Sequence, residues 1–238
     1  MFYKFLYYIK KIIYLLTPPI LKFETWVNKI KNFNKIENKF EYENNFYSRH
    51  SFILRALNNK SSYLEIGVSK NDVFNTIPLD LNNKIGVDPF SGGTHRTTSD
   101  AFFKKNKKKF DVIFIDGLHE YKQCQKDCIN SLKFLKSNGI IIFHDFLPRN
   151  SMEASNPRKQ KIWCGDIWKV AVEIHNSPFK EFKIVNIDMG IGLLKPQKKF
   201  RYKKLNNLKN MNYDDFYDKY FKDLPIINSE EALNFISK

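Results

Sequence analysis

The sequence predicts an α/β fold in which helices cover both faces of one mostly parallel β-sheet. Short apolar runs alternate with segments of helical spacing between about residues 51 and 195. Runs that are apolar throughout are typical of strands that are buried on both faces. The chain has 238 residues, and 42% of them are hydrophobic. This composition excludes a disordered chain and fits one large domain with extensions.

Four continuous apolar runs end in Gly or Asp and are predicted to be parallel strands. They cover residues 62–68, 84–90, 110–117 and 139–146. A further short strand is expected just before the segment TTSDAFF, which covers residues 97–103. Two later runs, residues 182–188 and 190–196, are predicted to form an antiparallel hairpin that closes the sheet.

The longest predicted helix covers residues 119–139 and ends at Asn138-Gly139. Its apolar face includes Cys124 and Cys128, which we expect in the core rather than on a metal. A second helix is predicted to begin at Gly165-Asp166. The three cysteines are too few for a disulfide scaffold, so a reducing, cytoplasmic compartment is the simpler interpretation.

The two ends of the chain differ from this pattern. Residues 1–44 are predicted to form a basic amphipathic helix and a linker. Within them, residues 1–21 have no uncharged run long enough to span a bilayer, but the helix could lie on a membrane surface. Docking of its apolar stripe on the domain or on a partner subunit is the alternative. Residues 45–197 are predicted to be the main domain, and residues 198–238 a basic, aromatic extension.

The formal net charge is +15, from 40 basic and 25 acidic residues. Such a charge suits an anionic partner, which could be a membrane, a nucleic acid or a charged glycan. An AT-rich coding genome, which favours Lys and Asn, is an equally simple explanation. Only six of the basic residues are Arg, the residue that reads nucleic-acid bases best, so a nucleic-acid partner is disfavoured.

Ligands of open α/β sheets bind at the carboxyl ends of the strands, so the residues there are the candidate site. The first strand ends at Gly67, which would let the backbone turn tightly against a ligand. Asp88 ends the second strand and could accept hydrogen bonds from both ribose hydroxyls of a nucleoside. A dinucleotide site would need G-x-G-x-x-G, but residues 65–71 contain one Gly. This favours a nucleoside cofactor without a pyrophosphate.

Several segments together resemble class I S-adenosylmethionine-dependent methyltransferases. They are YLEIGV, GVDPF, TTSDAFF, FDVIFIDGLHEY and IIFHDFLP. The resemblance is greatest to methyltransferase-24-type domains, which are associated with glycan biosynthesis, and it covers about residues 45–197. It implies a single Rossmann-like, seven-stranded, mostly parallel sheet whose last strand is antiparallel.

The resemblance also implies a set of residues that bind S-adenosylmethionine. One departure is Asn71, where many members of the family have Gly. The implied cofactor-binding residues are Glu65, Gly67 and Ser69 in the first loop, Asp88 at the ribose, Ser99 and Asp100 at the adenine, and Asp116.

A partial resemblance to macrocin-type sugar O-methyltransferases implies the catalytic residues. In those enzymes an Asp-x-x-His segment and an acidic pair bind magnesium, and the His is the base. Here Asp116 and His119 match the first element, whereas the second reads His144-Asp145. We expect His119 to be the base and His144 the next candidate. Asp116 and Asp145 would hold Mg²⁺ or another divalent cation, although a His in place of an acid suits magnesium poorly.

The expected function is therefore methylation of a sugar or another small hydroxylated acceptor. Arg149, Arg158, Trp163 and Trp168 are expected to form a wall of the acceptor site. The chain lacks the Asn/Asp-Pro-Pro-aromatic segment common among enzymes that methylate amino groups of nucleic acids. A nucleic-acid methyltransferase, a non-catalytic module peripheral to the inner membrane face and a nicotinamide-dependent oxidoreductase remain alternatives. The sequence leaves the acceptor, the metal and the oligomeric state open.

Overall fold

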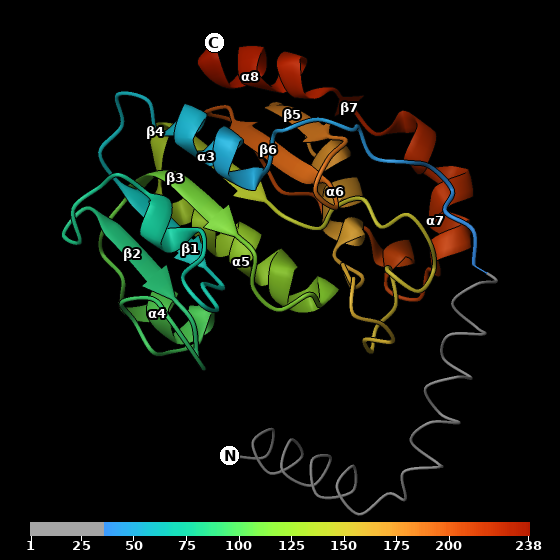
Figure 1. The fold of residues 1–238 in the computed structure, drawn as a ribbon, viewed down its shortest axis with the longest axis horizontal. Coiled ribbons are helices and arrows are strands. Elements are labelled where there is room, and N and C mark those ends of the chain that lie inside the picture. The colour runs from blue at the N-terminus through green and yellow to red at the C-terminus, as the bar shows by residue number, and fades with distance from the viewer. Residues whose placement is uncertain (1–35) are drawn as a thin grey trace, which may run out of the picture. The chain divides into compact units, whose positions relative to one another are not determined.

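A computed structural model describes residues 36–238 (Figure 1). The predicted amphipathic helix at residues 1–21 lies outside these described residues. Within them, no helix combines the length and the apolar character that crossing a membrane requires. Residues 39–238 form one compact unit.

The centre of this unit is a sheet of seven strands in the order β2-β1-β3-β4-β6-β5-β7. Strand β6 runs antiparallel to both of its neighbours, and all other pairs are parallel. This arrangement confirms the predicted fold class. The strands are β1 (Tyr63–Ile66), β2 (Lys84–Val87), β3 (Phe110–Ile115), β4 (Leu135–Phe143), β5 (Lys180–Val185), β6 (Ile191–Pro196) and β7 (Ile226–Ile227).

The seven strands are not all the ones that the sequence predicts. The short strand expected before residues 97–103 is absent, and only an isolated bridge from Val87 to His95 takes its place. The Gly92-Gly93 pair bends the chain back on itself there, with both residues at positive φ, so no ladder can extend. The seventh strand is instead β7, which the C-terminal extension adds beside β5.

Helices cover both faces of the sheet (Figure 1). Helices α3 and α8 lie side by side on one face, and α4, α5 and α6 pack against the other. The helices are α3 (Arg49–Ala56), α4 (Ser99–Lys105), α5 (Tyr121–Phe134), α6 (Trp168–His175), α7 (Tyr213–Lys219) and α8 (Ser229–Ser237), with short 3₁₀ turns at Phe74–Thr76, Asn206–Leu208 and Phe221–Asp223.

Helix α5 ends earlier than predicted. The sequence indicates an end at Asn138-Gly139, but the helix stops at Phe134 and β4 begins at Leu135. Leu135 pairs with Phe110 at the start of β3, so strand pairing replaces the last expected turn of helix. The inner face is as predicted, because Cys124 and Cys128 are buried as free thiols.

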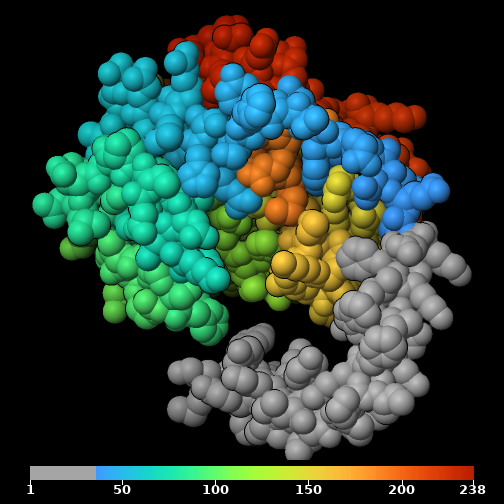
Figure 2. Space-filling model, viewed as in Figure 1, coloured from blue at the N-terminus to red at the C-terminus, as the bar shows by residue number. Residues whose placement is uncertain are grey.

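Residues 39–48, which we call the strap, connect the N-terminal side of α3 to distant parts of the unit. Tyr42 donates its hydroxyl hydrogen to the carbonyl of Leu147 at 2.6 Å. The Glu43 carboxylate accepts hydrogen bonds from the amide and hydroxyl of Ser229 at the start of α8. Figure 2 shows the strap in blue along the face of the molecule, beside orange residues near 190. The strap delivers Arg49 to the carboxyl edge of the sheet.

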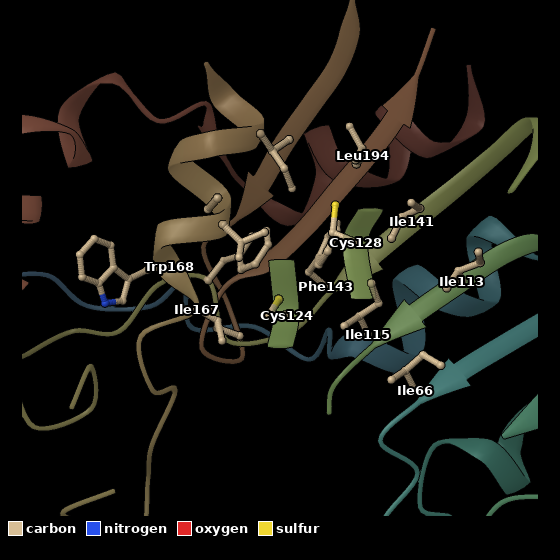
Figure 3. Close-up of a cluster of buried hydrophobic side chains, with 14 of the residues drawn as sticks. Ile66, Ile113, Ile115, Cys124, Cys128, Ile141, Phe143, Ile167, Trp168 and Leu194 are labelled. Atoms are coloured by element: carbon tan, nitrogen blue, oxygen red, sulfur yellow. The ribbon is translucent and has the colours of Figure 1, made fainter. Parts of the chain in front are cut away.

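The core is divided by the sheet into two apolar layers. Along β3, Val112 and Phe114 face the layer of α3 and α8, whereas Ile113 and Ile115 face the layer of α5 and α6. This alternation of side chains follows from the pleat of a strand. Figure 3 shows the second layer, in which Cys124 and Cys128 lie close to the strands and Trp168 lies farther from them. Burial on both faces explains why these strands read as continuous apolar runs.

Candidate active site

The loops that follow β1, β2, β3 and β4 meet at the carboxyl edge of the sheet. Figure 2 shows the surface hollowed there, between turquoise residues that follow β1 and β2 and yellow residues that follow β4. Green residues of the region from β3 to α5 lie at its floor. This is the place where open α/β sheets bind ligands.

Gly67 turns the chain at the end of β1 with a φ of 89°, a conformation that favours glycine. Its amide donates to the carbonyl of Val87 at 2.9 Å, which holds the first loop against β2. A Cβ at Gly67 would lie 2.5 Å from the carbonyl carbon of Asp116 and closer still to its oxygen. The sequence suggests that a ligand needs this space, but the neighbour is the backbone after β3.

Asp88 is buried and organises the loops after β1 and β2. One carboxylate oxygen accepts the Ser69 amide at 3.0 Å, and the other accepts the amides of Phe90 and Ser91 at 2.8 and 2.9 Å. Asn71 adopts the left-handed region, with a φ of 69°. Its side-chain oxygen accepts the Gly93 amide at 2.7 Å. Gly67, Ser69 and Asp88 are thus brought together.

Glu65 is buried below this loop, with 1% of its surface exposed. The hydroxyl of Tyr63 donates to its carboxylate at 2.7 Å. Burial raises the pKa of Glu65 to about 8, while the Tyr63 hydrogen bond acts in the opposite direction. The side chain is therefore mostly protonated at neutral pH, and a cationic group of a ligand would favour its charged form.

Ser99 and Asp100 lie in the first turn of α4 and contact α5. The Gln123 amide donates to the Ser99 hydroxyl at 3.1 Å, and Lys126 lies 3.3 Å from an Asp100 carboxylate oxygen. Asp100 is exposed. No hydrogen bond found among residues 36–238 joins either side chain to Asp88, so a shared adenine site stays a prediction.

Four side chains that follow β3 and β4 converge at the floor of the hollow. His119 Nε2 lies 3.2 Å from an Asp145 oxygen and 3.7 Å from an Asp116 oxygen. His144 Nδ1 lies 3.0 Å from the same Asp145 oxygen and 3.3 Å from the same Asp116 oxygen. The parallel register of β3 and β4 places the ends of these strands side by side, which brings the four together.

Buried opposite charges fix the protonation of this cluster. Burial disfavours the charged form of His144, but Asp145 and Asp116 outweigh it and raise the pKa of His144 well above its ordinary value. The pKa of His119 is also raised: Asp116 and Asp145 outweigh the effect of burial. The two histidines and Arg49 hold the pKa of Asp116 well below its usual range. The two carboxylates therefore favour the cationic form of both imidazoles.

Arg49 and Asp188 belong to the same cluster, although sequence reasoning missed them. Arg49 binds Asp188 with two nitrogens at 2.8 Å each and Asp116 with a third at 2.8 Å. Asp188 in turn lies 3.3 Å from His144 Nε2. Arg49 comes from α3 and Asp188 from the β5–β6 turn. No motif marks them, but the strap and the closing hairpin bring them to the site.

The segment between β4 and α6 holds His119 from the outside. The Trp163 ring stacks on the His119 ring with centroids 4.9 Å apart, and the Trp163 carbonyl lies 3.0 Å from His119 Nδ1. A Cβ at Gly165 would lie 2.8 Å from His119 Cβ and closer still to the His119 carbonyl oxygen. Arg158 lies over the Trp163 ring at 5.6 Å. Trp163 and Arg158 thus lie beside the hollow, as expected for an acceptor wall.

Two other residues expected in this wall are elsewhere. Trp168 is buried and stacks on Phe216 at 4.3 Å, because its ring fills the core between α6 and α7. Arg149 points to the buried Glu153, which it reaches at 2.6 Å. The prediction for these two was therefore wrong.

The donor set of the cluster fits a transition metal better than magnesium. Asp116, His144 and Asp145 offer ligand atoms within 4.8 Å of one another. Neither ring nitrogen of His144 makes a hydrogen bond of good geometry within the described residues, and neither do the Asp145 oxygens. Buried polar atoms of this kind usually have a partner. Imidazole with carboxylates suits zinc, iron or manganese, whereas Mg²⁺ prefers oxygen ligands alone.

Comparison with known proteins finds one family model that is similar to the central part of the chain. Residues 64–146 match the family Methyltransf_24, which is described as a methyltransferase domain. Among curated proteins, none matches the sequence significantly.

Three solved structures are similar at low identity. An SAH-bound methyltransferase from Podospora anserina is 13% identical (64% of this chain, 80% of that chain, TM-score 0.46). An O-methyltransferase from Bacillus cereus in complex with SAH is 14% identical (78% and 94%, TM-score 0.43). An N-methyltransferase from Bradyrhizobium japonicum is 15% identical (66% and 95%, TM-score 0.38). At these TM-scores the likeness is too weak to support a function.

Proposed function

We propose that this protein is an S-adenosylmethionine-dependent O-methyltransferase that acts on a sugar or another small hydroxylated acceptor. The observation that carries the proposal is the extent of the methyltransferase match. Residues 64–146 contain the Gly67 turn, Asp88 and the whole cluster of Asp116, His119, His144 and Asp145. One matched segment therefore supplies both a nucleoside-binding loop and a group of acids and bases at the same sheet edge.

The first loop is suited to S-adenosylmethionine. The Asp88 carboxylate already accepts three backbone amides, and its one remaining lone pair, on the oxygen that accepts the Ser69 amide, would accept a ribose hydroxyl. Glu65 would face the positively charged methionine end, and the proximity of that charge would lower its pKa from about 8. Glu65 would thus become charged, and attract the methionine end, only when that cation binds.

Methyl transfer is an in-line displacement, in which the acceptor oxygen bonds to the methyl carbon while the carbon–sulfur bond breaks. His119 would take the hydroxyl proton at Nε2, because its Nδ1 faces the Trp163 carbonyl. Asp116 and Asp145 would stabilise the imidazolium that results. They also raise the pKa of His119. His119 therefore loses its proton, and can act as a base, more readily when a further positive charge lies nearby or when the pH is higher.

A divalent cation would resolve this conflict between the acids and the base. Asp116, His144 and Asp145 would hold it, and it would supply Lewis acidity that lowers the pKa of the acceptor hydroxyl. The chain's own contribution is to place two carboxylates and an imidazole within reach of one ion. Arg49 occupies the second oxygen of Asp116, which leaves the first oxygen for the cation.

An oxygen acceptor in the form of a sugar is supported by the exposed wall. Trp163 is a half-buried aromatic ring of the kind that stacks on sugar rings, and a sugar would take the place of Arg158, which lies over this ring. The wall also holds His119, so an acceptor on Trp163 would lie beside the base.

The test of this function has a binding arm and a reaction arm. Calorimetry should detect S-adenosylmethionine binding to the wild type. The variant Asp88→Asn should bind it about 10- to 100-fold more weakly, because one charge-assisted acceptor is lost. The exposed Asp80→Asn is the matched control. Equal affinity of wild type and Asp88→Asn, at unchanged thermal midpoints, would refute the assignment of Asp88.

The reaction arm uses mass spectrometry of sugar and nucleotide-sugar acceptors after incubation with the methyl donor. A mass gain of one methyl group is expected, and it should fall when a chelator is present. His119→Ala should abolish the gain but leave donor affinity nearly intact. Methylation of RNA with no methylation of any glycan would contradict the proposed acceptor class.

A further inference from the structure

A basic groove crosses the opposite edge of the sheet from the active site. It has a volume of about 1590 Å³. Its walls come from the end of α3, the start of β4, the end of the antiparallel β6 and the end of α8. These are the amino ends of the parallel strands, so the groove shares no side chain with the site described above.

The groove is strongly cationic. Among the described residues, Glu181 is the only acidic one that lines it. Lys238, the last residue of the sequence, also lines it. The other basic lining residues are Arg55, Lys60, Lys136, Lys195, Lys198 and Arg201. Only Lys136 has an acidic partner at ion-pair distance within residues 36–238, namely Asp111 at 2.8 Å.

Two lysines show that these charges repel one another. Lys60 and Lys195 are half-buried. Burial lowers the pKa of Lys60, Asp111 opposes this shift in part, and the charge of Lys195 adds a smaller lowering. Lys195 donates to carbonyls at the end of α8, and its cross-strand neighbour Glu181 offsets its charge only in part. Asp111 and Glu181 offset only part of the positive charge of the seven basic residues, and such an excess of cations is the arrangement expected for an anionic ligand.

The remaining lining residues indicate which kind of anion fits. Single-stranded nucleic acid would need exposed aromatic faces for base stacking. Phe200 is buried, and the Tyr202 hydroxyl is bound to Glu173 at 2.7 Å. In their place the groove offers exposed amides, which can hydrogen bond to sugar hydroxyls. These amides belong to Asn58, Asn59, Asn138 and Gln197.

We propose that this groove binds an anionic polysaccharide, whose acidic groups contact the lysines and whose hydroxyls contact the amides. The site is independent of methyl transfer, because it lies at the other sheet edge. It would hold a chain of several sugar units rather than a single ion, since the groove is far larger than one anion. Part of the net charge of +15 would then serve to bind this ligand.

The test measures binding of a fluorescein-labelled oligogalacturonate by the full-length protein. A neutral malto-oligosaccharide and a single-stranded RNA, both of matched length, are the comparison probes. The groove variant is Lys198→Glu with Arg201→Glu, since both side chains are exposed and Arg201 donates to the adjacent Phe200 carbonyl. The control variant with the same charge change is Lys104→Glu with Lys107→Glu, on exposed positions outside the groove.

We expect the wild type to bind oligogalacturonate, more weakly as salt rises, and to ignore the neutral probe. The groove variant should lose at least about tenfold in affinity and the control variant less than about twofold. Equal losses of affinity in both variants would mean that the probe is attracted only by the overall charge, and this would overturn the proposed site. Tighter binding of RNA, lost in the groove variant, would assign it to nucleic acid instead. Absence of oligogalacturonate binding would also overturn the proposal. Donor affinity, measured in parallel, should not change in either variant.

Discussion

Gly67 has no room for a side chain, because the backbone of Asp116 occupies the space where a Cβ would lie. We expect Gly67→Ala to destabilise the protein by about 2–5 kcal/mol, through the strained φ of an L-residue and the overlap. Gly117→Ala is a matched control, since its Cβ would meet nothing closer than 3.5 Å. Chemical denaturation measures both. A Gly67→Ala protein as stable as the control would show that the loop can move away from β3.

Glu65 makes the stability of the ligand-free protein depend on pH. Its pKa is raised to about 8 from 4.5, so the folded state keeps a proton that the unfolded state loses. Stability from this group is therefore present below pH 4.5 and falls as pH rises through 8. Glu65→Gln removes this loss. At about 1.4 kcal/mol per pKa unit, the variant should gain on the order of 3–5 kcal/mol over wild type at pH 9.

The measurement is denaturation of both proteins at pH 5 and pH 9. The result is the change, between the two pH values, in the difference of unfolding free energy between variant and wild type. The exposed Glu230→Gln should show no such change. Parallel curves for Glu65→Gln and wild type would mean that the buried carboxyl is ionised after all.

At this scale the sequence marks residues at strand ends well, because Gly and Asp there have a recognisable local context. It marks Gly67 and Asp88 for that reason, whereas Asp116 and His119 were identified through the family resemblance. Arg49 and Asp188 could not be found in this way, since they come from the strap end and a hairpin turn and meet only in space. At Gly67 the structure adds a reason that sequence reasoning did not give, because a Cβ there would meet the backbone of Asp116.

Among the elements, the segment between β4 and α6 controls the position of His119. Gly165→Ala should displace the His119 backbone, since its Cβ overlaps with that residue. A misplacement of about 1 Å costs on the order of 10²-fold in turnover, whereas donor affinity should stay the same because β1 and β2 are untouched. Ser151→Ala, exposed on the same segment, is the control. Turnover and calorimetry of one preparation separate the two effects. Equal turnover in both variants would show that this segment does not position the base.

The sequence predicts strands better than their boundaries and edges. The apolar runs of β1 to β4 identify central strands, because burial on both faces leaves a clear pattern. β7 has two residues and depends entirely on pairing with β5, so no local pattern could reveal it. The end of α5 was misjudged for a related reason: Asn138-Gly139 looks like a helix end, but pairing with β3 decides where β4 begins.

In the whole molecule, the C-terminal extension belongs to the same core as the sheet. Phe216 of α7 is fully buried against Trp168. Phe216→Ala should cost about 3–5 kcal/mol of unfolding free energy in a single cooperative transition. Phe46→Ala, at a fully exposed position, should change it by less than about 0.5 kcal/mol. Denaturant titration followed by circular dichroism measures both. Two separate transitions would show that the extension folds on its own.

Strand β4 joins the two proposed sites, because its first residues line the basic groove and His144-Asp145 follow its last. From Ile140 to His144 the strand spans on the order of 13 Å, at about 3.3 Å per residue. This stretch is a rigid spacer that no ligand can shorten. A polymer that binds at both edges must run around the outside of the molecule, and this path is longer than the direct distance along β4. Short oligosaccharides can then occupy one edge at a time, and only long chains can be tethered at one end while modified at another.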